Sequence, residues 1–200
     1  LFLTDDQAAA LNNSAVAKPF VDALLLQADA MVAAPLVTYN FEAPRCSQPG
    51  TCLAWGPLNS TTGSLAPEPD RLPPVGSLDT ATVLRRVATL AWAHRVRNSA
   101  GDSPYLRAAV RQLKATVSWP SWYWPTGQAE QLANGMWAVA IGYDWLHASL
   151  PPSDREELRE GLLRHGLLAA RRAAHEAPWW RRNTGSSAGL AVFSASTAAC

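Results

Sequence analysis

Apolar residues recur every three to four positions over most of the second half of the chain, which is the spacing of one helix face. From Asp79 onward, four such stretches follow one another with short breaks, at about 81–97, 104–117, 128–149 and 153–175. An earlier stretch, 18–34, has the same spacing. None of them alternates between apolar and polar residues as a half-buried strand does. The pattern therefore predicts an all-α fold.

Local signals support these boundaries. Ser103-Pro104 is a capping residue followed by proline at the first helical position. Ser153 and Glu156 have the spacing of a capping box and follow a Pro-Pro pair. Short turns between amphipathic helices are typical of antiparallel αα-hairpins. A closed toroid of hairpins, an open solenoid and an ordinary bundle all fit this pattern.

Residues 35–80 break the helical pattern, because eight of the fifteen prolines fall there. A loop of that length is unusual in a compact domain, so we expect it to wrap the surface or cover a cleft. Cys46 and Cys52 flank a turn-forming stretch within it, as either a small disulfide loop or two free thiols. The predicted organisation is an N-terminal helix with an irregular lead-in (1–80), a helical-hairpin segment (81–183) and a small-residue tail of doubtful structure (184–200).

Composition narrows the classes of function. The 200 residues are 48% hydrophobic and 16% charged, and the net charge is +1. Near-neutral charge excludes the global basic field that many nucleic-acid binders use. No apolar run approaches the roughly 18 residues that a membrane span needs. No Cys-x-x-Cys, closely spaced histidine pair or glycine-rich phosphate loop occurs, so the sequence predicts neither a metal site nor a nucleotide cofactor.

Tryptophan is abundant, and seven of the nine lie within residues 119–180. A proline-broken loop between two predicted helices carries Trp119, Trp122, Tyr123 and Trp124. Flat aromatic rings stack on sugar faces, and loops concentrate function. The same rings could instead pack as core over the ends of the hairpins.

A second aromatic group follows the last predicted helix, where Trp179 and Trp180 precede Arg181, Arg182 and Asn183. Indoles beside guanidinium groups suit an anionic sugar, which needs stacking and bidentate recognition of a carboxylate or sulfate. The alternative is a solvated basic helix end that complements the helix dipole.

Two strings resemble a known family. Residues 138–146 read AVAIGYDWL and residues 150–155 read LPPSDR, as in the heparinase II/III-like and alginate-lyase-like polysaccharide lyases. Supporting similarity extends over about residues 20–183 and includes 101–105 and 118–122. The resemblance implies part of an incomplete (α/α) toroid, followed in the family by an antiparallel β-sandwich domain. It also implies β-elimination of uronate-containing polysaccharides by side chains alone, in an extracellular or periplasmic location.

The resemblance also implies site residues. Asn183 matches the family's asparagine-rich string and would neutralise the C5 carboxylate, although the expected Trp and second Asn beside it are absent. The cleft would be lined by Trp119, Trp122, Tyr123, Trp124, Trp179 and Trp180, with Arg181 and Arg182 holding the polyanion. The family's catalytic tyrosine is not matched, so we expect a lyase fragment with little or no activity by itself. The alternatives are a non-catalytic carbohydrate-binding or structural toroid, and a helical scaffold in which Trp122 and Trp124 are buried.

Overall fold

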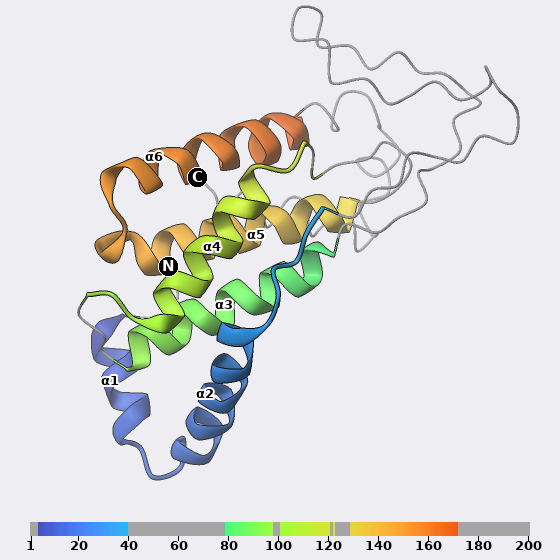
Figure 1. Ribbon diagram of the computed structural model, residues 1–200. Helices are drawn as coiled ribbons and strands as arrows, with labels where there is room; N and C mark the ends of the chain where they lie inside the picture. Colours follow the sequence, from blue (N-terminus) through green and yellow to red (C-terminus); the bar gives the residue numbers. More distant parts are fainter. Residues whose placement is uncertain (1–3, 40–78, 98–100, 121, 123–128, 172–200) are drawn as a thin grey trace, which may run out of the picture. The chain divides into compact units, whose positions relative to one another are not determined.

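The structure, a computed structural model, describes residues 4–39, 79–97, 101–120, 122 and 129–171 (Figure 1). All regular elements in these ranges are helical, which confirms the all-α prediction. The helices are α1 (Asp5–Asn13), α2 (Lys18–Ala33), α3 (Thr80–Val96), α4 (Pro104–Val117), α5 (Ala129–Leu146), the 3₁₀ turn η1 (His147–Ser149), α6 (Pro152–Gly161) and the π-helical segment η2 (Leu162–Leu167). Each of the five predicted stretches contains a helix, and α1 is additional.

Two helix starts show how local sequence sets the boundaries. Helix α1 begins with a capping box in which the Gln7 amide N–H donates to Thr4 Oγ1 and the Thr4 amide N–H donates to Gln7 Oε1. This Thr-x-x-Gln spacing is a sequence signal for a helix that hydrophobic periodicity did not reveal. In α4, Ser103 Oγ accepts the Leu106 amide N–H at 3.1 Å, and Pro104 follows as the first helical residue, as predicted.

The predicted capping box at Ser153 and Glu156 is wrong. Helix α6 begins earlier, at Pro152, and its N-cap Pro151 makes no side-chain capping bond. Proline has a φ already suited to the first helical turn and lacks the N–H that a cap would satisfy, so the helix starts there. Glu156 instead pairs with Arg159, one turn further along the same helix.

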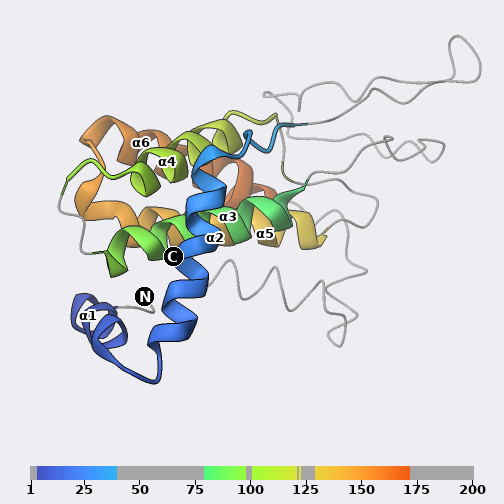
Figure 2. The same cartoon turned by 60° about the horizontal axis from the view of Figure 1, so that its bottom comes forward.

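Helix α3 is the centre of the packing, since it contacts α1, α2, α4 and α5 (Figures 1 and 2). Its Val83, Val87 and Leu90 are fully buried. On α2 the buried face is narrow, because Leu25 and Ala28 are buried whereas the neighbouring Leu24 is 39% exposed. The buried positions of α2, at 21, 25 and 28, are those of a single narrow face. Only that face is covered, so the adjacent leucine stays at the surface.

Glycines set the distances between the later helices. A Cβ added to Gly142 in α5 would lie 2.8 Å from Leu113 Cδ1 and 2.9 Å from Val87 Cγ1. A Cβ added to Gly161 in α6 would lie 2.5 Å from the Cβ of Val117 in α4. A larger residue at either position would require the neighbouring side chains or helices to shift. Gly142 lies inside the AVAIGYDWL string, so this packing is a structural reason for the glycine there.

A buried amide ties the segment after α2 to α4. Gln112 is fully buried, and its Oε1 accepts the Val37 amide N–H at 3.0 Å while its Nε2 donates to the Val37 carbonyl oxygen at 3.0 Å. Near the start of α4, the Tyr105 hydroxyl donates to Asp29 Oδ1 at 2.6 Å, and this bond joins α4 to α2. Residues 1–38 accordingly belong to the same compact unit as the helices that follow residue 79.

Candidate functional site

Trp122 lies in the core and not at an open surface. It is fully buried, and its Nε1 donates to the Thr116 carbonyl oxygen at the end of α4 at 2.9 Å. The ring lies over Gly135 of α5, where an added Cβ would be 3.0 Å from it, and its edge also approaches Gly166 of η2. The indole therefore fills the space that two glycines leave between α4, α5 and η2.

Trp119 is also buried, with 4% of its surface exposed. Neither Trp119 nor Trp122 presents an exposed ring face on which a sugar could stack, so in this structure both act as packing residues. The other predicted site residues lie outside the described part of the chain: Tyr123, Trp124, Trp179, Trp180, Arg181, Arg182 and Asn183. Their assignment, like that of Cys46 and Cys52, stays a prediction.

Three further tryptophans lie within α3 and α5 and are half-buried. Trp92, Trp137 and Trp145 have intermediate exposure. Trp145 Nε1 is a buried donor without a hydrogen-bond partner among the described residues. An indole N–H normally finds an acceptor when it is buried. Trp145 is therefore half-buried with one unsatisfied donor.

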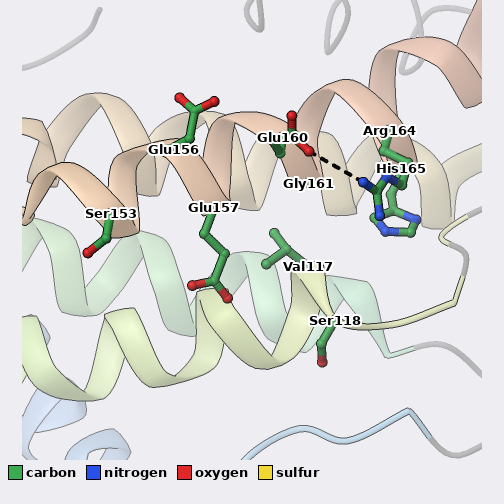
Figure 3. Close-up of a pocket in the computed structure, with 9 residues that line it drawn as sticks. All are labelled: Val117, Ser118, Ser153, Glu156, Glu157, Glu160, Gly161, Arg164 and His165. Carbon is green, nitrogen blue, oxygen red and sulfur yellow. Dashed lines mark hydrogen bonds and ion pairs between the residues drawn. The ribbon is translucent and has the colours of Figure 1, made fainter.

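A groove of about 480 Å³ runs between the end of α4 and the helix α6–η2 (Figure 3). One wall is Val117 and Ser118, and the other carries charged and polar side chains at intervals of three and four residues. These are Ser153, Glu156, Glu157, Glu160, Arg164 and His165, and Gly161 lies among them. That spacing places them on one helix face and is a sequence signal that could have indicated the groove.

The glutamates of this groove are paired with cations. Lys114 Nζ lies 3.0 Å from Glu157 and 3.1 Å from Asp154, which links α4 to α6. Glu160 pairs with Arg164 at 3.3 Å, the contact drawn in Figure 3. Hydrogen bonds from Lys114 to Glu157 and then Asp154 raise the pKa of the Lys114 ammonium. With three carboxylates against one guanidinium in its lining, the groove is a poor site for a polyanion.

His165 connects the groove to the core. It lines the groove, and its ring centroid lies 5.7 Å from that of Trp122 at a tilt of 40°. Burial, and secondarily the charge of Arg164, lowers the pKa of its imidazole. The neutral ring is therefore favoured near pH 7, with one nitrogen able to accept a hydrogen bond. The ring belongs to η2, whose π-helical turns are uncommon in proteins and frequent at functional sites.

A second histidine joins three elements. His94 in α3 is 4% exposed, with Nδ1 2.8 Å from Ser103 Oγ and Nε2 3.0 Å from Ser149 Oγ. Ser103 is the N-cap of α4 and Ser149 ends η1, so the imidazole joins α3 to both. Burial, and then the charge of Arg95, lowers the pKa of His94. Because Ser103 also caps α4, we interpret this pair of hydrogen bonds as a structural link between the three elements.

The described residues limit the other kinds of site. No group of three or more His, Cys, Asp or Glu side chains among them is placed to hold a metal ion. None of the helices within the described ranges combines the length and apolarity needed to cross a bilayer.

Comparison with known proteins adds no assignment. The chain matches no family, and no curated protein matches it. The resemblance to the polysaccharide lyases therefore stays a prediction from the strings at 138–146 and 150–155.

Proposed function

We propose that this chain is the helical, glycan-holding portion of a heparinase II/III-like polysaccharide lyase for uronate-containing polysaccharides. The observation that carries the proposal is the setting of the AVAIGYDWL string. It forms the second half of α5, its Gly142 lies against Leu113 and Val87, and the LPPSDR string that follows leads into α6. The string therefore lies where α5 packs closely against α3 and α4, which supports a fold shared with the family it resembles.

The helix arrangement supports the finer part of the proposal, an incomplete (α/α) toroid. In Figure 1, α3, α4, α5 and α6 reverse direction one after another, which supports a pairing of α3 with α4 and of α5 with α6 as hairpins. Helix α3 contacts α5, and α4 contacts α6. This gives two layers, one of α3 and α5 and one of α4 and α6, which is the way hairpins stack in helical arrays.

In this proposal the glycan is held by the aromatic and basic residues after the last helix. Trp179 and Trp180 would stack on sugar rings, Arg181 and Arg182 would pair with carboxylates, and Asn183 would neutralise the C5 carboxylate during β-elimination. Trp119 and Trp122 are packing residues in this proposal and do not contact the glycan. The groove between α4 and α6 is not part of this site, because its excess of carboxylates has the same sign of charge as the substrate.

The test is a binding and cleavage screen on the full 200-residue chain. Polyuronates and a neutral glucan are compared by affinity electrophoresis, and cleavage is followed by the ultraviolet absorbance of the unsaturated uronate product. We expect binding to polyuronates only, weakened in Trp179→Ala and Arg181→Ala/Arg182→Ala, with little or no product. Lys18→Ala, an exposed cation on α2, is the matched charge control. No polyuronate binding, or equal binding in all variants, would contradict the proposal.

The burial of Trp119 and Trp122 favours one alternative, a structural helical scaffold without glycan binding. In that case neither aromatic group contacts a ligand. The same screen separates the two, because a scaffold gives no retardation with any glycan while the circular dichroism of the chain shows folded helices.

A further inference from the structure

Three arginines gather where α3 and α4 meet the carboxyl end of α2. Arg86 of α3 is only 8% exposed, and its Nη1 donates to the Pro35 carbonyl oxygen at 2.6 Å and to Gln112 Oε1 at 3.0 Å. Arg111 of α4 is exposed and donates from Nη2 to the Val32 carbonyl oxygen at 3.4 Å. Arg85, next to Arg86 on α3, is exposed as well.

This cluster has an excess of positive charge. Arginine is rarely buried without a carboxylate partner, yet both bonds of Arg86 go to neutral oxygens. No ion pair within the described ranges includes any of the three arginines. Burial, and then the charges of Arg111 and Arg85, lowers the pKa of Arg86. The carbonyl end of α2 offers only about half a negative charge in compensation.

The orientation of the buried Arg86 guanidinium is fixed by its hydrogen bonds, but not all of its N–H donors have protein partners. Both of its bonds use Nη1, which fixes the plane of the group. Among the described residues, no nitrogen of Arg86 is a buried atom lacking a partner, so Nε and Nη2 keep contact with solvent. A guanidinium edge with free, fixed donors has the geometry for bidentate binding of an oxyanion, and little side-chain entropy remains to be lost.

We propose that Arg85, Arg86 and Arg111 form a binding site for a single oxyanion, a carboxylate or a sulfate group. Arg86 supplies the fixed donors at the base of the site, and the two exposed arginines supply charge at its rim. The proposal stands apart from the glycan-binding function, because inorganic sulfate alone tests it. On an acidic polysaccharide, one carboxylate or sulfate substituent would occupy the site.

The experiment is a titration of the ¹⁵N-labelled full chain with sodium sulfate, and separately with sodium glucuronate, at constant ionic strength maintained with chloride. Arginine Nε–H resonances are followed by NMR and assigned with the single variants. We expect a saturable shift of the Arg86 Nε–H resonance. Arg85→Gln/Arg111→Gln alters only exposed residues and should weaken the affinity by about tenfold or more. Arg107→Gln is the matched control, because Arg107 is an exposed α4 arginine already paired with Asp102.

Each outcome of the titration either supports or contradicts the oxyanion site. Saturation in the wild type and in Arg107→Gln, lost or weakened in the double variant, supports the site. A shift that is linear in sulfate, or an unchanged affinity in a folded double variant, overturns it. If the double variant does not fold, Arg85→Gln and Arg111→Gln are titrated singly with the same two criteria. Sulfate binding without polyuronate binding would leave this site standing and contradict the proposed function.

Discussion

Replacing Trp122 by alanine distinguishes a core tryptophan from a sugar platform. The side chain is fully buried over Gly135, and its indole N–H is bonded to the Thr116 carbonyl oxygen. Removing a buried large aromatic side chain costs about 3–5 kcal/mol, from lost transfer energy and the cavity that remains. We therefore expect Trp122→Ala to lower the free energy of unfolding by about 4 kcal/mol, a large part of the 5–15 kcal/mol typical of a domain.

The assay is urea unfolding followed by far-ultraviolet circular dichroism, because the other tryptophans complicate fluorescence. For a chain of this size, the loss corresponds to a fall in Tm of about 8–16 °C. Trp122→Phe keeps most of the ring and loses the hydrogen bond, so it should cost about 1–2 kcal/mol. Leu26→Ala, a truncation of a side chain that is 72% exposed, should change stability by no more than about 0.5 kcal/mol.

One result would refute this reasoning. If Trp122→Ala unfolds within about 1 kcal/mol of the wild type and loses polyuronate binding, the ring is a ligand platform and its buried position is not the functional one.

Three further predictions concern packing, polar burial and pH. Gly142→Ala should lower the free energy of unfolding, measured in urea, by about 1–3 kcal/mol, because the added Cβ would overlap Leu113. The gain of about 1 kcal/mol in helix propensity should not compensate. A net increase in stability would show that the helices can separate freely. Gln112→Ala should cost about 2–4 kcal/mol, since it leaves polar groups of Arg86 and the Val37 backbone without partners, and a neutral effect would mean that water replaces the amide. His94 and His165 have lowered pKa values in the native chain, so the unfolded chain binds more protons below about pH 6.5. Stability should therefore decline as the pH falls below that value, less steeply in His94→Gln, and a flat profile in the wild type would contradict the burial of both rings.

The arginine cluster and the groove illustrate why candidate sites are hard to find from sequence. Arg86 and Arg111 are separated along the chain and have ordinary helical neighbours, so nothing in the sequence indicates that they share the end of α2. The groove beside α6 is different, since Glu157, Gly161 and His165 follow one another at intervals of four residues on the same helix face. Only the position of α4 opposite that face, set by the contact of Gly161 with Val117, makes it a groove.

Local sequence alone determined most of the helices of this protein. Periodic apolar residues and the Ser103-Pro104 start place α2 to α5 within a few residues of their observed bounds, because capping and side-chain periodicity act over a single turn. The same local rules mark α1 through its Thr-x-x-Gln box. They failed at Ser153, where the preformed φ of a proline outweighed a side-chain cap.

Tertiary structure decided which residues became core and which charges came together. The local sequence around a proline-flanked tryptophan is compatible both with a solvent-exposed and with a buried side chain. Trp122 is inside because Gly135 and Gly166, from two other helical segments, leave a space of its size. Leu24 is exposed because only one face of α2 is covered by other helices. Arg86 is buried beside other cations because the segment that follows α2 packs against it. Burial depends on packing between distant segments, and hydrophobic periodicity within one helix carries no information about them.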